Sequence, residues 1–144
     1  MNPRYLALCV ASSCFWVTIA YGIGHTEIPR NLIWAGALAG PFIGITVGEL
    51  YLIVLGRSRF ERAAMALLTL YVAAGLFGLA IGVFDAFQGL DDGSPRDTFA
   101  VLLEGVFTTL WGLTFTGYVL LLWPLAYLNH NLVGRLASPP ATAK

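Results

Sequence analysis

Glu49 is the residue whose type and position most clearly suggest chemistry, because its carboxyl group interrupts a long apolar run. The run WAGALAGPFIGITVGEL covers residues 34–50 and contains no other charged residue. A carboxylate inside a membrane is costly unless it is protonated, paired or facing water. Two interpretations stay open: Glu49 is a proton or cation site, or it is a hydrogen-bonded residue of the structure or of an interface.

Hydroxyl groups on the apolar runs extend this candidate polar site. Thr46 shares a predicted helix face with Glu49, Tyr71 lies on the next run, and Thr109 and Thr116 share one face of the last run. Threonine often bonds to the backbone of its own helix, so packing is the alternative role for the threonines. We therefore expect one proton, cation or docking site formed from Glu49, Thr46, Tyr71, Thr109 and Thr116.

Patterns for catalysis or cofactor binding are not found in the sequence. It contains no nucleophile triad, zinc motif or phosphate-binding glycine loop. His25 and His130 are predicted at opposite membrane surfaces, as surface imidazoles, so they cannot hold one haem between them. Cys9 and Cys14 point to different faces of one helix and are interpreted as small packing residues. We expect no enzyme activity, metal or cofactor.

Composition sets the class of protein in which these residues must be positioned. The chain has 144 residues, of which 58% are hydrophobic and 11% are charged, far from the values of an average soluble domain. These values predict an all-α integral membrane protein. Eight Lys and Arg residues and a net charge of zero argue against a nucleic-acid partner.

Four apolar runs predict a four-transmembrane-helix bundle, because each can cross a hydrocarbon core of about 30 Å. The predicted helices cover residues 5–24, 32–55, 63–86 and 98–128. Ser94, Pro95 and Asp97 signal the start of the last helix, and Pro124 predicts a bend near its end. Residues 1–136 form a single predicted domain, and residues 137–144 form a flexible tail.

Basic residues predict the orientation of this bundle, since Lys and Arg are retained on the cytoplasmic side of short loops. With the N-terminus inside, the cytoplasmic set is Arg4, Arg57, Arg59, Arg62, Arg135 and Lys144. Only Arg30 and Arg96 then lie outside. We expect both termini in the cytoplasm and place the protein in a bacterial inner membrane.

Small residues at a spacing of four mark the second and third predicted helices. They are Gly36, Gly40, Gly44 and Gly48 on the second helix and Ala74, Gly78 and Gly82 on the third. Small residues allow helix backbones to approach closely in lipid. The pattern predicts a glycine zipper in which these two helices pair. An interface within the bundle and one with another copy or a larger partner both stay open.

The function favoured by these patterns is a non-catalytic accessory, scaffolding or assembly subunit of a larger membrane protein complex. The alternative is a small oligomeric channel or a proton- or cation-coupled transporter in which Glu49 is the intramembrane carboxyl. A membrane enzyme or redox subunit has the least support. The expected partners are the lipid bilayer and other integral membrane subunits or copies of the same chain.

Overall fold

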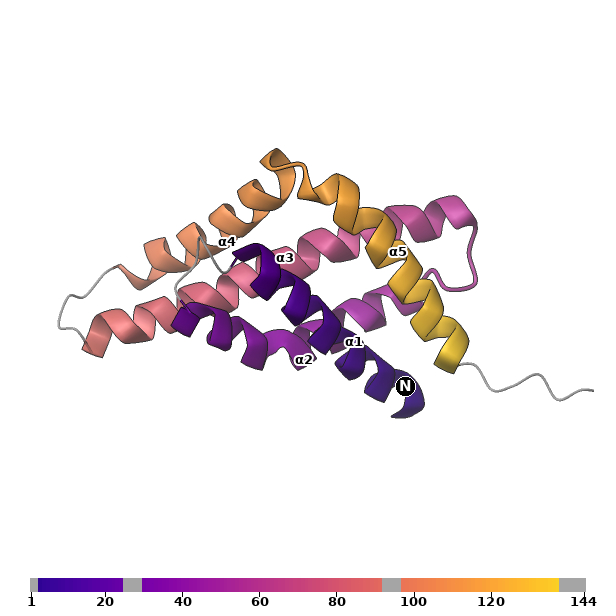
Figure 1. Ribbon diagram of the computed structural model, residues 1–144, viewed down its shortest axis with the longest axis horizontal. Coiled ribbons are helices and arrows are strands. Elements are labelled where there is room, and N and C mark those ends of the chain that lie inside the picture. Colours follow the sequence, from indigo (N-terminus) through magenta and orange to yellow (C-terminus); the bar gives the residue numbers. More distant parts are fainter. Residues whose placement is uncertain (1–2, 25–29, 92–96, 138–144) are drawn as a thin grey trace, which may run out of the picture.

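The computed structural model describes residues 3–24, 30–91 and 97–137, and within these ranges the chain forms five helices (Figure 1). The helices are α1 (Pro3–Gly24), α2 (Arg30–Leu52), α3 (Arg59–Asp91), α4 (Thr98–Phe115) and α5 (Tyr118–Ala137). Three described segments are long and apolar enough to cross a membrane: Trp34–Leu52 in α2, Arg59–Gln88 in α3 and Thr98–Phe115, which is α4. The apolar stretch of α1, Pro3–Ile19, is shorter. The expected all-helical fold is thus confirmed for the described residues.

The last apolar run forms two helices where one was expected. The first, α4, begins after Asp97, whose side chain accepts a hydrogen bond from the Phe99 amide at 3.0 Å. The predicted signals Ser94 and Pro95 lie outside the described residues. The break between α4 and α5 follows from Gly117, whose φ of +76° is a left-handed conformation that glycine adopts with little strain. Pro124, which was expected to bend the run, lies within α5.

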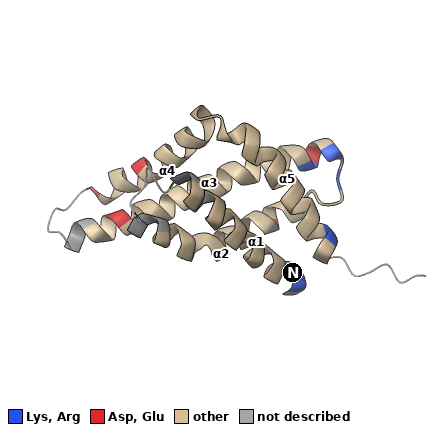
Figure 2. Cartoon of the chain, in the orientation of Figure 1, with Lys and Arg blue, Asp and Glu red and all other residues tan. Residues whose placement is uncertain are grey.

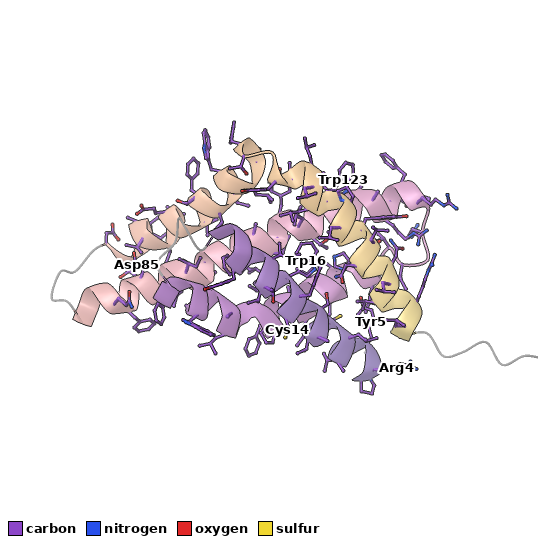
Figure 3. All side chains as sticks on the ribbon, in the orientation of Figure 1. Arg4, Tyr5, Cys14, Trp16, Asp85 and Trp123 are labelled. Atoms are coloured by element: carbon purple, nitrogen blue, oxygen red, sulfur yellow. The ribbon has the colours of Figure 1, made fainter. Side chains whose placement is uncertain are left out.

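The longest helix, α3, runs along the length of the molecule and contacts α2, α4 and α5 (Figure 1). The N-terminal helix α1 packs against α2 and α5. One buried cluster joins α2, α3 and α5 through Tyr51, Val54, Ala66 and Ala126. Tyr5 and Cys9 form a second cluster with the last turns of α5, and Figure 3 shows Tyr5 near that end of the bundle.

The glycines of α2 lie mainly against α1. A Cβ atom placed on Gly44 would lie 2.7 Å from the Cβ of Ser13 and 2.8 Å from the carbonyl oxygen of Cys9. Gly40 and Gly48 also face α1, whereas a Cβ on Gly36 would meet the ring of Phe77 in α3. Residues four apart on a helix drift by about 40° at each step, so the two ends of this series face different neighbours.

The small residues of α3 lie against α4. A Cβ on Gly78 would meet the backbone of Gly105, and a Cβ on Gly82 would lie 3.0 Å from the Cα of Leu102. The carbonyl of Ala74 accepts a hydrogen bond from the Thr109 hydroxyl at 3.0 Å. Although α2 and α3 are neighbours, these contacts differ from the expected pairing of one small-residue series with the other.

Charged residues gather at opposite ends of the molecule (Figure 2). The described basic residues at one end, here named the basic end, are Arg4, Arg57, Arg59, Arg62 and Arg135. They belong to the start of α1, the α2–α3 connection, the start of α3 and the end of α5. Asp85 and Asp97 lie toward the other end, in the later part of α3 and just before α4.

Candidate functional site

Five side chains form an interior polar cluster between α2, α3 and α5. They are Tyr51, Arg62, Thr69, His130 and Asn131. Tyr51 and Thr69 are fully buried, and His130 is 9% exposed. Polar groups that are buried in this way must find partners inside the protein.

His130 occupies the centre of the interior polar cluster. Its ring stacks on Tyr51 with ring centroids 4.3 Å apart and an interplanar angle of 15°. Its Nε2 atom lies 3.1 Å from the hydroxyl oxygen of Thr69. The Thr69 hydroxyl donates to the carbonyl of Ala66 at 2.9 Å. His130 therefore joins α5 to both α2 and α3.

Asn131 makes the remaining links of the cluster. Its Nδ2 atom donates to the Tyr51 hydroxyl at 3.2 Å and to the Tyr127 carbonyl at 2.6 Å. Its Oδ1 atom accepts a hydrogen bond from Nη1 of Arg62 at 2.6 Å. The buried Nε of Arg62 has no hydrogen-bond partner among the described residues.

Hydrogen bonds from neighbouring side chains attach α1 to this region and add a further link between α3 and α5. The Tyr5 hydroxyl of α1 donates to the Gly48 carbonyl of α2 at 2.9 Å. Asn129 of α5 donates to the Ser12 hydroxyl at 2.7 Å. The indole of Trp123, labelled in Figure 3, donates to the Ala63 carbonyl of α3 at 2.7 Å. These bonds show that the part of the bundle near the basic end is held together by polar as well as apolar contacts.

The burial of His130 contradicts the prediction of a surface imidazole. The prediction failed because it ended the helix at residue 128, whereas α5 continues to Ala137. The buried face of α5 contains Ala126, His130, Val133, Gly134 and Ala137. This spacing of three and four was the signal that could have revealed it. His25 lies outside the described residues, and those residues contain no group of three His, Cys, Asp or Glu able to hold a metal ion.

Glu49 lies on the opposite side of α2 from the bundle interior. Its side chain is exposed, while its neighbours Gly48 and Tyr51 are buried. Within the described ranges, Glu49 has no hydrogen bond or ion pair. It also lies in the last turn of α2, where the negative end of the helix dipole disfavours a carboxylate. The carboxyl group is therefore not stabilised by the helix end on which it sits.

The hydroxyls predicted to accompany Glu49 have other partners. The Thr46 hydroxyl donates to the Phe42 carbonyl of its own helix at 2.9 Å. The Tyr71 hydroxyl oxygen lies 3.2 Å from the hydroxyl oxygen of Thr114 in α4. Besides Ala74, the Thr109 hydroxyl is within hydrogen-bond distance of carbonyls in its own helix. Thr116 likewise contacts the Gly112 carbonyl. The structure thus brings none of these four hydroxyls into a hydrogen bond with Glu49.

Exposed apolar side chains precede Glu49 along what we name the outer face of α2, formed by Trp34, Leu38, Phe42 and Glu49. The three apolar members are 69%, 76% and 73% exposed, respectively. Leu38, Phe42 and Thr46 also line an open, mainly apolar groove of about 600 Å³ between α2 and α3. The α3 wall of this groove includes Leu79, Val83 and Phe87. Thr46 is one turn before Glu49, so the groove leads toward the carboxyl group.

Glu104 is another exposed carboxyl within a segment able to cross a membrane. It lies in the second turn of α4, near the positive end of that helix and toward Asp97. Aromatic side chains follow it on α4, where Trp111 stacks on both Phe107 and Phe115. Like Glu49, Glu104 has no hydrogen bond or ion pair in the described residues, but the positive end of α4 favours its carboxylate, whereas the negative end of α2 disfavours that of Glu49.

No family model, curated protein or solved structure matches the chain. The interior polar cluster makes most of its hydrogen bonds within the chain, whereas the carboxyl on the outer face of α2 has no hydrogen bond or ion pair in the described residues.

Proposed function

We propose that the protein is a non-catalytic accessory, scaffolding or assembly subunit of a larger membrane protein complex. The observation that carries this proposal is the exposed carboxyl of Glu49, which has no hydrogen-bond or ion-pair partner in the described residues and is flanked by exposed apolar side chains. A contact with another membrane protein would remove that carboxyl from lipid and cover the apolar surface beside it. The outer face of α2 is then an assembly surface.

The depth of Glu49 supports this proposal. The apolar segment Trp34–Leu52 has its centre at Ile43, six residues before Glu49. At a rise of about 1.5 Å per residue, the Glu49 backbone lies about 9 Å from the centre of the segment. A hydrocarbon core of about 30 Å extends about 15 Å on each side of its centre. A carboxylate at this depth requires a partner, a proton or water.

The proposal includes a topology of four membrane crossings, in which α4 and α5 together make the last one. The start of α1, the α2–α3 connection and the end of α5 all lie at the basic end (Figure 2). By the positive-inside rule, that end and both termini face the cytoplasm, in a bacterial inner membrane. The interior polar cluster joins the helices near that side and has a structural role.

A second candidate function is an oligomeric channel or a proton- or cation-coupled transporter. The same unpaired carboxyl favours it, because intramembrane carboxyls mark many ion pathways. Glu49 faces away from the bundle interior, so such a pathway would have to form between copies of the chain. In that case the partner across the outer face of α2 is a second copy, and not a different protein.

Purification of the intact assembly from the native membrane tests the function. We expect native mass spectrometry to show the chain with a different membrane protein at fixed stoichiometry, and the Glu49→Gln variant to lose that protein. Glu104→Gln is the matched control, because it makes the same chemical change on another exposed helix face. A chain that purifies as a monomer would refute the proposal. A homo-oligomer whose ion flux is lost in Glu49→Gln would establish the second candidate instead.

A further inference from the structure

Resting on the proposed function, we infer that the outer face of α2 and the adjoining groove bind one transmembrane helix of a different membrane protein, and that this helix presents a Lys or Arg to Glu49.

The position of Glu49 determines the charge that the occupant must carry. The carboxyl is exposed, has no partner in the described residues and lies at the negative end of α2. A cation at contact distance favours the charged carboxylate through an attraction that is strong where water is scarce. A neutral apolar helix would cover the carboxyl without compensating its desolvation.

The same charge argues against a second copy as the occupant. Two copies in the same membrane orientation, related by a two-fold axis beside α2, would bring the two Glu49 side chains to the same depth and toward each other. Two carboxylates at close range in a medium of low polarity repel each other. A different chain that carries a cation meets the electrostatic requirement without this repulsion.

The spacing between the groove and Glu49 determines where the cation must lie along the occupying helix. Phe42 and Thr46 of α2 and Val83 of α3 line the groove, and Glu49 follows Thr46 by three residues. The occupying helix therefore fills the groove with apolar side chains and places its cation about 4–5 Å further toward the basic end, a distance of three residues at the helical rise. Apolar packing in the groove and the ion pair are then made by one continuous helix.

Binding of designed peptides to the full chain in zwitterionic vesicles tests this inference. The probe is a helical Leu/Ala peptide with a single Lys six residues from its middle, and the reference peptide has Leu at that position. Energy transfer between the labelled chain and labelled peptide reports binding. We expect the Lys peptide to bind at least about tenfold more tightly than the Leu peptide, which corresponds to about 1.4 kcal/mol.

Variants of the chain separate the ion pair from the groove. Glu49→Gln should abolish the preference for the Lys peptide, whereas the matched change Glu104→Gln should preserve it. Phe42→Ala should weaken the binding of both peptides to a similar extent, because it alters the groove and leaves the carboxyl in place. Thermal unfolding of each variant confirms that it is folded, and Glu49→Asp provides a second carboxyl variant that should retain the preference for Lys.

Three outcomes would overturn the inference: equal binding of the Lys and Leu peptides to the unmodified chain, retention of the Lys preference in Glu49→Gln, or self-association of the chain through Phe42 that excludes both peptides. These results are distinguishable from failure of the proposed function. A native complex that persists without any Lys preference refutes the inference alone, whereas the absence of a native complex refutes the proposed function.

Discussion

The interior polar cluster and the outer face of α2 place polar groups on the same bundle in two different ways. In the cluster, His130 lies within hydrogen-bond distance of Thr69 and stacks on Tyr51, and Asn131 donates to the Tyr51 hydroxyl. On the outer face, Glu49 has exposed apolar neighbours and no described hydrogen-bond or ion-pair partner. Polarity within a membrane helix therefore does not by itself indicate function. A polar group that is satisfied inside the chain serves the fold, whereas a carboxyl that is exposed, has no partner in the described residues and sits at the negative end of its helix points to a partner.

Replacing Tyr51 by Ala tests the structural side of this comparison and should have the largest effect. Tyr51 is fully buried, and its ring supports His130. Loss of a large buried aromatic side chain should lower the free energy of unfolding in detergent by about 3–5 kcal/mol. Phe42→Ala, on the outer face of the same helix, is the control and should change it by much less. If the two variants lost similar amounts of unfolding free energy, the distinction between a structural cluster and a non-structural outer face would be wrong.

Gly44→Leu sharpens the contrast between the two sides of α2. Leucine at this position cannot avoid the Ser13 side chain or the Cys9 carbonyl of α1. We expect α1 and α2 to separate at a cost of about 1–3 kcal/mol, the usual range for overpacking. Gly75→Leu is the matched control, because a Cβ at Gly75 meets no other atom within 4 Å. Equal stability of the two leucine variants, measured by thermal unfolding, would contradict the close α1–α2 contact.

Thr69→Val removes one hydroxyl from the interior polar cluster while keeping the shape of the side chain. His130 would lose its contact with Thr69, so the free energy of unfolding should fall by about 1 kcal/mol, as for a typical hydrogen bond. The same change at Thr46, whose hydroxyl bonds only to its own helix in the described structure, should cost less. Chemical denaturation in detergent measures both. The prediction fails if the Thr46 variant loses as much stability as the Thr69 variant.

Glu49→Gln should have the smallest effect on stability. The side chain is exposed, so the free energy of unfolding of the isolated chain should change by less than about 0.5 kcal/mol, as is usual for surface substitutions. Assembly with the partner should nevertheless be lost, as measured by native mass spectrometry. A variant that unfolds easily but keeps its partner would assign Glu49 to the fold and not to the assembly surface.

The positions of the helices could largely be predicted from the sequence, because apolar length is a strong signal. The expected helix over residues 32–55 corresponds to α2, and that over residues 63–86 lies within α3. The break at Gly117 was not predicted, since glycine is common inside membrane helices and its positive φ is not visible in composition. Spacing revealed the small-residue contacts but not their partners, which depend on how the helices rotate about their axes.

Helical periodicity reveals which side of α2 carries Glu49, but not which side chains meet in space. The exposed side of α2 follows from helical periodicity, which separates Glu49 from the Gly40, Gly44 and Gly48 contacts with α1. The interior polar cluster was missed, because it brings together residues about 60 to 80 positions apart, such as Thr69 with His130 and Tyr51 with Asn131. No local pattern in a single sequence specifies contacts between residues so far apart in the chain.

The turn at Gly117 limits how far changes in one helix are transmitted to the next. In a continuous helix, each inserted residue rotates every later side chain by about 100°. Here α4 ends at Phe115 and α5 starts at Tyr118. Within the turn, the Leu120 amide donates a hydrogen bond to the Gly117 carbonyl at 3.0 Å. An insertion or deletion in α5 would therefore disturb the contacts of His130 while leaving the register of Gly105 against α3 unchanged. The two halves of the last apolar run can thus accumulate length changes independently.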